Sequence, residues 1–144
     1  MNEVSPNQDL IPIGTQVEFA KTIGESDIYL FAGITGDFSP NHVNAEYMKT
    51  TPYGGIIAHG VLVVGLMSTC STTVLDYPLS PHPAVSYGYD RIRFIKPVHV
   101  GDTVTVTYEI IYADPHEART TAQVTATNQR GDVVAVATHI LKFL

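Results

Sequence analysis

Alternating apolar and polar residues dominate the second half of the chain and predict antiparallel strands. Between residues 103 and 112, valine, isoleucine and tyrosine alternate with threonine and glutamate, and the run EARTTAQVTAT at 117–127 alternates in the same way. Residues 84–97 predict a further long strand that ends at Pro97. The last run, VVAVATHILKFL at 133–144, is apolar on both faces, so we expect it at the centre of a sheet or at an interface.

The first half of the chain carries one strand pattern followed by helical patterns. The run TQVEFAKTI at 15–23 suits a strand. Apolar residues at helical spacing then predict a helix over 25–35 that ends at Gly36. Asn44 is expected to cap a short helix, AEYMK, at 45–49.

The segment from 60 to about 75 is apolar nearly all round at its start, so a helix there must be buried on most sides. A sheet that covers such a helix has to curl around it. The chain therefore predicts an α+β fold in which an antiparallel sheet of about five strands wraps around one long buried helix. The 144 residues, 44% hydrophobic and 15% charged, suit a single domain spanning 1–144.

Charge and composition argue against several classes of protein. The formal net charge is −6 and there is no basic run, so we expect no nucleic-acid partner. The longest apolar stretch, 56–67, is too short to cross a bilayer, and the opening MNEVSPNQDLIPIG lacks the pattern of a signal peptide. A single cysteine, Cys70, rules out an internal disulfide. We expect a cytoplasmic protein without a membrane partner.

The chemistry of the chain is concentrated in two short stretches. GDFSPNH at 36–42 places a carboxylate, Asp37, and an imidazole, His42, five positions apart around a proline. GGIIAHGVLVVG at 54–65 brings a His-Gly pair to the start of the predicted buried helix. A carboxylate and an imidazole that share one bound water can act as a general acid–base pair.

These stretches, together with RFIKPVHVGDTV at 93–104 and the order of elements, resemble the MaoC-like, (R)-specific enoyl-CoA hydratases of the hot-dog fold. The likeness extends from about residue 15 to the C-terminus. The chain departs from the family pattern in having Ser39 where asparagine is more common and Asn41 where the family usually has an apolar residue.

The resemblance implies reversible, syn addition of water to a trans-2-enoyl-CoA, giving an (R)-3-hydroxyacyl-CoA. It implies that Asp37 and His42 are the catalytic pair and that the Gly60 N–H stabilises the thioester oxyanion at the helix start. Ser68 takes a secondary role, holding Asp37. Coenzyme A is part of the substrate, so we expect no separate cofactor and no metal. The family's pairing through continuous sheets implies a homodimer with the acyl pocket near the interface.

Each of these residues also has a purely structural interpretation. Asp37 and His42 suit a polar turn before proline, Gly60 suits close helix–sheet packing, and Ser68 suits packing on the helix. The histidines outside the pair show no metal-ligand spacing and are interpreted as structural, with His59 as a neighbour of the oxyanion loop: His59, His82, His99, His116 and His139.

Two further groups have a simple interpretation. Cys70 falls inside the predicted buried helix and is expected to be a small core residue and not a nucleophile. Arg91, Arg93 and Lys96 cluster near the end of a predicted strand, where they suit either the phosphates of coenzyme A or an ordinary solvated edge.

Three other functions compete with hydration of a coenzyme A thioester. The same chemistry on acyl carrier protein thioesters would be helped by a basic entrance, and the acidic chain favours free coenzyme A thioesters. A hot-dog thioesterase needs an activated water near the carbonyl carbon, which does not call for the Asp37–His42 pair. A non-catalytic hot-dog subunit should have lost one member of that pair.

Overall fold

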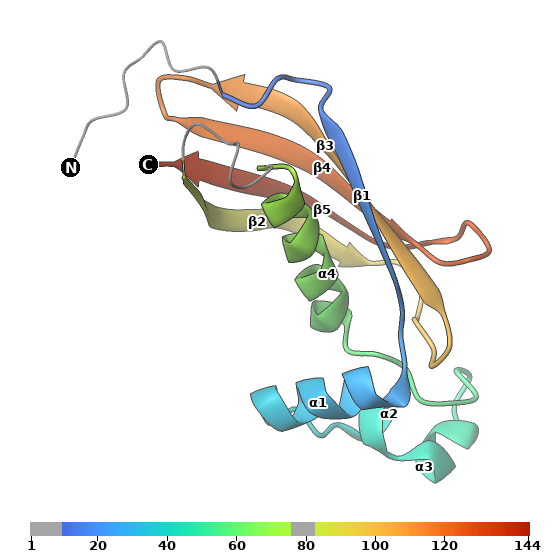
Figure 1. Ribbon diagram of the computed structural model, residues 1–144. Helices are drawn as coiled ribbons and strands as arrows, with labels where there is room; N and C mark the ends of the chain where they lie inside the picture. The colour runs from blue at the N-terminus through green and yellow to red at the C-terminus, as the bar shows by residue number, and fades with distance from the viewer. Residues whose placement is uncertain (1–9, 76–82) are drawn as a thin grey trace.

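The computed structural model describes residues 10–75 and 83–144 (Figure 1). His82 lies outside the described residues. The elements in chain order are β1 (Gln16–Thr22), α1 (Glu25–Thr35), α2 (Pro40–Val43), α3 (Ala45–Lys49), α4 (Gly60–Thr73), β2 (Ala84–Phe94), β3 (Thr103–Asp114), β4 (Arg119–Thr127) and β5 (Val133–Phe143).

The five strands form one antiparallel sheet in the order β1-β3-β4-β5-β2. β5 lies between β4 and β2, which confirms the central position predicted from its two apolar faces. β1 and β2 are the edges. β2 ends at Phe94, three residues before the predicted end, and it carries a register shift between Asp90 and Arg93. Arg91 adopts a positive φ of 53° at this irregularity.

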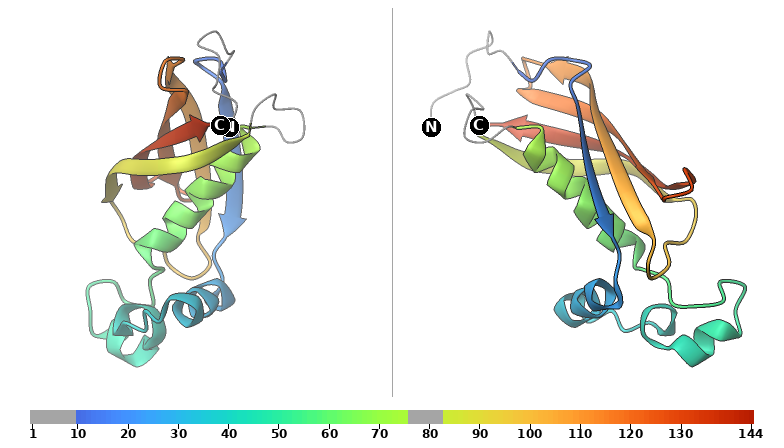
Figure 2. Two further views of the ribbon diagram at one scale, coloured as in Figure 1. Left: turned by 90° about the vertical axis from the view of Figure 1, so that its left-hand side faces the viewer. Right: turned by 45° about the vertical axis from the view of Figure 1, so that its right-hand side comes forward.

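The sheet curves over one side of α4, while α1, α2 and α3 gather beyond the start of that helix (Figures 1 and 2). This is the predicted α+β arrangement of five strands around one long helix. None of the helices in 10–75 and 83–144 has the length and apolar character needed to cross a membrane.

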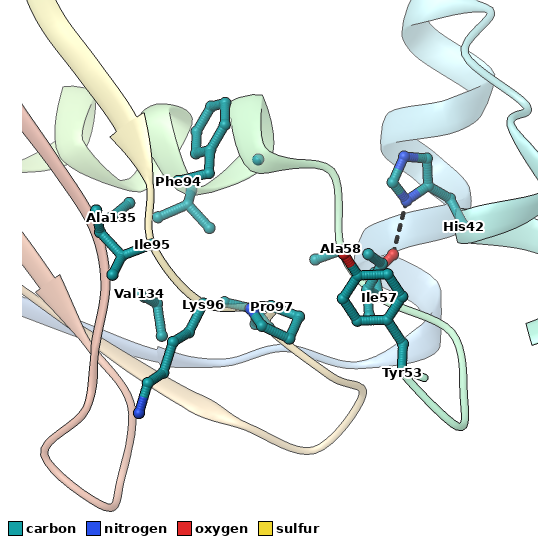
Figure 3. A pocket seen from close by; sticks show the side chains of 13 residues that line it. His42, Tyr53, Ile57, Ala58, Phe94, Ile95, Lys96, Pro97, Val134 and Ala135 are labelled. Atoms are coloured by element: carbon teal, nitrogen blue, oxygen red, sulfur yellow. Dashed lines mark hydrogen bonds between the residues drawn. The ribbon is translucent and has the colours of Figure 1, made fainter. Parts of the chain in front are cut away.

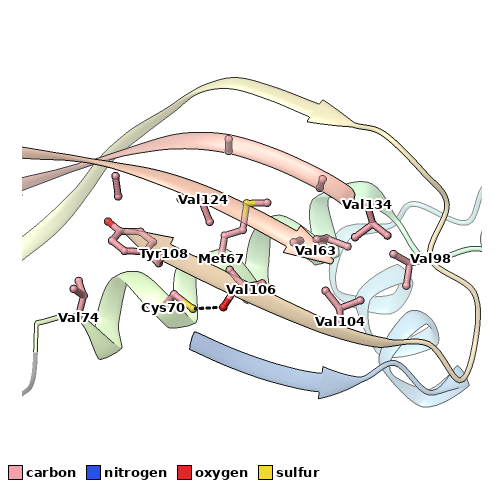
Figure 4. Packing of buried hydrophobic residues seen from close by; sticks show 14 of the residues in the cluster. Val63, Met67, Cys70, Val74, Val98, Val104, Val106, Tyr108, Val124 and Val134 are labelled. Carbon is pink, nitrogen blue, oxygen red and sulfur yellow. Dashed lines mark hydrogen bonds between the residues drawn. The ribbon is translucent and has the colours of Figure 1, made fainter. Parts of the chain in front are cut away.

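The core fills the space between the sheet and one face of α4. Val63, Met67 and Cys70 point from the helix toward buried strand residues such as Val106 and Val124 (Figure 4). All five of these residues are at most 2% exposed. Burying such side chains is the main stabilising contribution to a domain of this size.

The prediction that α4 is buried on most sides is wrong for a single chain. Val61 is 53% exposed, and Leu62, Val64 and Leu66 are only partly buried. The physical reason is that five strands cover one side of a helix and leave the opposite side uncovered. A second apolar face therefore remains on α4.

The helical part of the chain follows the sequence closely. α1 covers the predicted 25–35, and Gly36 ends it in the left-handed conformation with φ of 81°. Asn44 caps α3 through its side-chain oxygen, which accepts the Tyr47 N–H at 3.0 Å. The short helix α2 was not predicted, because four residues starting at Pro40 are too few to show helical periodicity.

Candidate active site

His42 is placed by α2 at the start of α4. Its side chain is 9% exposed, so it is a buried residue and not the loop side chain that the sequence predicts. Its Nδ1 lies 2.7 Å from the Ile57 carbonyl oxygen (Figure 3). Because a carbonyl only accepts, Nδ1 carries the hydrogen and donates it. The Nε2 atom of the neutral ring therefore holds a lone pair and is able to take a proton.

Asp37 follows the left-handed Gly36 on an exposed turn. Its Oδ1 accepts the Ser39 N–H at 3.2 Å, and its own N–H donates to the Thr35 hydroxyl at 3.2 Å. One side-chain oxygen of Asp37 lies within 4.8 Å of ring nitrogens of both His42 and His59. The fold thus brings together the two residues that the sequence selects as a pair.

His59 joins this pair, which the sequence did not predict. It is the residue before α4 and is 1% exposed. Its Nε2–H donates to the Asp37 carbonyl oxygen at 3.0 Å, and its ring stacks on His42 with centroids 3.7 Å apart and planes 24° apart. Phe31 of α1 packs on the His59 ring at 4.7 Å.

A carboxylate and two imidazoles are common metal ligands, and Asp37, His42 and His59 bring these groups together. The geometry of the two rings, however, does not suit a shared ion. A metal bound by two imidazoles lies close to both ring planes, about 2.1 Å from each nitrogen. The centroids of the two stacked rings are 3.7 Å apart and their planes are inclined by 24°, so the planes converge only well beyond the rings. The cluster suits a hydrogen-bonded water better than a chelated ion.

A cavity of about 260 Å³ opens beside His42, Tyr53 and Phe94 (Figure 3). Gly60, the first residue of α4, also lines it. Among the described residues, no acceptor is bonded to the Gly60 N–H, as expected for the first turn of a helix. An imidazole with a free lone pair and an unpaired amide therefore line one cavity. Its remaining walls are largely apolar, and its lining is completed by Tyr53, Ile57, Ala58, Val63, Phe94, Ile95, Lys96, Pro97, Val98, Val134 and Ala135.

Gly60 also packs against β2. A Cβ atom built on Gly60 would lie 2.7 Å from two atoms of the Phe94 ring, closer than such contacts occur. The close-packing interpretation of this glycine is therefore correct in part. It does not conflict with a role for the N–H, because the Phe94 ring is 53% exposed and able to move.

Ser68 does not hold Asp37. It lies on α4 two turns beyond Gly60, which is about 12 Å along a helix axis. Its side chain is exposed and close to Tyr89 of β2, and among the described residues Asp37 has no bond to it. The Asp37 carboxylate is held by the Ser39 N–H instead.

The other histidines have structural surroundings. His99 Nε2–H donates to the Tyr53 carbonyl oxygen at 2.9 Å, and His116 is exposed. His139 is fully buried between the hydroxyls of Tyr108 and Ser86, each at 2.8 Å.

Of the remaining predicted residues, Cys70, Arg91 and Arg93 lie apart from the catalytic pair, whereas Lys96 lines the cavity beside His42. Burial raises the pKa of Cys70 to about 11, which suits a core thiol. Lys96 pairs with Asp132 at 2.8 Å. Arg91 and Arg93 line a separate hollow of about 390 Å³ on the sheet.

Comparison with known proteins matches residues 8–133 to the family model described as MaoC like domain. An (R)-specific enoyl-CoA hydratase from Rhodospirillum rubrum is 41% identical over 114 residues, covering 79% of this chain and 76% of that protein. A 3-hydroxybutyryl-CoA dehydratase from Methylorubrum extorquens is 34% identical over 126 residues, covering 88% and 76%. The solved structure of an unliganded R-hydratase from Pseudomonas aeruginosa aligns with a TM-score of 0.78 at 30% identity, covering 92% of this chain and 81% of that one. The predicted hot-dog fold is thereby confirmed.

Proposed function

The chain belongs to the MaoC-like domain family, and we propose that it is an (R)-specific enoyl-CoA hydratase, a hydro-lyase that adds water reversibly to trans-2-enoyl-CoA. One observation carries the proposal. His42, whose ring lies close to the Asp37 carboxylate, lines a largely apolar cavity that is also lined by Gly60, whose N–H has no bonded acceptor among the described residues. Hydration of a conjugated thioester needs an acid–base pair and an oxyanion donor, and these groups supply both.

The proposed reaction uses one water held between the Asp37 carboxylate and His42 Nε2. Nε2 accepts a proton as the water oxygen bonds to C3, and the electrons of the C2–C3 double bond move toward the thioester oxygen. The Gly60 N–H, at the positive end of α4, stabilises the charge on that oxygen. C2 then takes a proton from the pair, so that hydroxyl and hydrogen add to the same face. Dehydration follows the same steps in reverse.

The hand of the product and the carrier of the acyl group are inferred from the relatives. The similar proteins are named as an (R)-specific hydratase and as a dehydratase, both acting on coenzyme A thioesters. The net charge of −6 also favours free coenzyme A thioesters over the acidic acyl carrier protein. We therefore assign the substrate as an enoyl-CoA and the product as an (R)-3-hydroxyacyl-CoA.

A panel of substrates tests this assignment. With trans-2-enoyl-CoAs of increasing length we expect the absorbance of the conjugated thioester to disappear, and with saturated acyl-CoAs we expect a thiol reagent to detect no release of coenzyme A. Release of thiol without loss of conjugation would identify a thioesterase. Faster turnover of the same acyl chain on acyl carrier protein would show that the carrier is wrong.

We propose that the active form is a homodimer. Large apolar residues are exposed on α4, on the edge strand β2 and directly after it: Val61, Val85, Phe94 and Ile95. Unpaired strand edges and contiguous apolar patches are usually covered by a partner. Phe94 and Ile95 also line the cavity, so a partner on this side would lie close to the acyl group.

We also propose a cytoplasmic location. The free, buried thiol of Cys70 is compatible with a reducing compartment. Fractionation of cells that express the chain tests this, and recovery with the membrane fraction would contradict it.

A further inference from the structure

The His59 side chain connects three parts of the proposed site. It immediately precedes Gly60, so its position is tied to the start of α4. Its Nε2–H bonds to the Asp37 backbone, and its ring lies against His42. The side chain is 1% exposed, which keeps water away from both contacts.

We propose that His59 is a positioning residue, which fixes the Asp37 carboxylate and the His42 ring relative to the oxyanion donor without touching the substrate. The proposal rests on the proposed hydratase function. It assigns His59 no proton transfer, because its Nε2–H is already used by the Asp37 carbonyl oxygen.

Asp37 needs an anchor of this kind. Its other hydrogen bonds, to Thr35 and Ser39, are local bonds within its own exposed turn. Within the described residues, the bond from His59 is the one hydrogen bond that ties Asp37 to another part of the fold. Without it, the turn that carries the carboxylate is free to move away from α4.

His42 needs a second contact for a different reason. The bond from Nδ1 to Ile57 holds one edge of the ring and, because a hydrogen bond tolerates some bending, still permits a small rotation about the Cβ–Cγ bond. A ring stacked 3.7 Å away restricts that rotation and so fixes the direction of the Nε2 lone pair. Phe31, on the His59 ring at 4.7 Å, supports the stack from α1.

The choice of histidine is itself informative. The Nδ1 atom of His59 is buried and has no hydrogen-bond partner within the described part of the chain. An unpaired buried acceptor is costly, and an apolar ring of the same shape would avoid that cost. A residue selected for packing alone would therefore be phenylalanine, so the Nε2–H donor is the feature that favours histidine here.

Three variants separate the two contacts. His59→Phe keeps the ring and loses the donor, His59→Gln keeps a donor near the Nε2 position and loses the stack, and His59→Ala loses both. We expect kcat for enoyl-CoA hydration to fall about 10-fold in each single-contact variant and about 100-fold in His59→Ala, with KM within about threefold, because small misplacements of reacting groups have effects of this size.

Histidine ¹⁵N NMR gives a readout that does not depend on activity. In the wild-type protein we expect His42 to carry its hydrogen on Nδ1 and His59 on Nε2, each as one fixed tautomer. His59→Phe should preserve the fixed His42 tautomer. In His59→Gln and His59→Ala the ¹⁵N signals of His42 should instead show an average of the two tautomers. His99→Phe is the matched control, since it removes an Nε2–H bond to a backbone carbonyl outside the stack and should leave the His42 signals unchanged.

The outcomes are distinguishable. Averaged tautomers of His42 or His59 in the wild-type protein overturn the positioning role without any variant. The positioning role is also overturned if the wild-type chain hydrates enoyl-CoA and His59→Phe and His59→Gln are as active as the wild type, with unchanged His42 signals. A wild-type chain with fixed tautomers and no hydration refutes the proposed function and leaves the geometric role of His59 standing.

Discussion

At the scale of single residues, Asp37 and His42 have different structural settings although the sequence places them in one motif. Asp37 is exposed on a turn, and His42 is buried on α2. The pair was predictable because both residues lie within one short segment. The His59 contact was not, because the contacts of His59 with Phe31 and His42 depend on three segments that meet only in the folded chain.

Removing either member of the pair should abolish most of the activity. We expect Asp37→Asn and His42→Ala each to lower turnover at least about 100-fold, within the range for acid–base groups. Asp37→Asn should leave stability unchanged, whereas His42→Ala should lower it because the ring is buried. Steady-state hydration assays and thermal unfolding check both.

Glu46→Gln is a matched control for these variants, because it neutralises an exposed carboxylate on the neighbouring helix α3. It should stay within about twofold of the wild type, as surface substitutions usually do. Near-normal hydration by a folded Asp37→Asn or His42→Ala protein would show that the residue concerned is wrongly assigned.

The role of the Gly60 N–H as oxyanion donor can be tested by substitution at this position. Gly60→Pro deletes the donor at a first helical position, where proline is tolerated, and its Cβ meets the Phe94 ring as that of alanine does, so the effect of the donor is the loss beyond that of Gly60→Ala. We expect kcat/KM to fall about 10²- to 10³-fold, the usual effect of losing an oxyanion donor. Gly60→Ala keeps the donor but adds a Cβ, and we expect a substantial loss there as well.

A second background separates the two causes of the Gly60→Ala effect. Phe94→Ala removes the ring that the new Cβ would meet at 2.7 Å. If the loss persists in Gly60→Ala/Phe94→Ala relative to Phe94→Ala alone, the Cβ obstructs the thioester oxygen. If the loss of activity disappears in the Phe94→Ala background, the requirement for glycine comes from packing against Phe94.

At the scale of elements, periodicity predicted each strand and the long helix but not the local irregularities. The bulge at Asp90–Arg93 brings Arg91 to a positive φ that nothing in its residue type favours. The apolar pattern of α4 overestimated the burial of this helix in a single chain, where Val61 is 53% exposed. A pattern records that a face avoids water, and it does not say whether the same chain or a second copy covers that face.

The contact between β3, β5 and β2 at His139 predicts a pH-dependent stability. Burial lowers the pKa of His139 from 6.5 to about 4. Between these values the unfolded chain binds the proton and the folded chain does not, so acidification favours unfolding. This group should lower the free energy of unfolding by up to about 3 kcal/mol as the pH falls from 6.5 to 4.

Urea unfolding at pH 7, 6 and 5 measures this effect, with His139→Gln as the comparison. The variant should be less stable at pH 7, because the bonds to Tyr108 and Ser86 are lost or weakened. Its free energy of unfolding should also fall less on acidification, because the contribution of His139 is gone. Asp27 and Asp102, whose pKa values are lowered by hydrogen bonds and nearby cations, are present in both proteins and affect both equally. Parallel declines in the two proteins would exclude His139 as the source.

At the scale of the whole molecule, Val61 of α4 and Phe94 of the edge strand β2 are exposed apolar residues, and Phe94 also lines the cavity. We expect a solution mass of twice the 15.7 kDa of one chain at micromolar concentration, measured by analytical ultracentrifugation. Val61→Glu should shift the mass toward that of one chain, because it places a charge on the exposed apolar face that we propose as part of the dimer interface. A wild-type protein that stays at one chain's mass would contradict the dimer.

The most direct test of the proposed mechanism is hydration of trans-2-enoyl-CoA in deuterium oxide, with the product analysed by NMR. A single water held on one face by Asp37 and His42 predicts a 3-hydroxyacyl-CoA with one deuteron at C2, added syn to the new hydroxyl, and the R configuration at C3. A mixture of C2 diastereomers, anti addition, or no product while the substrate stays conjugated would contradict it.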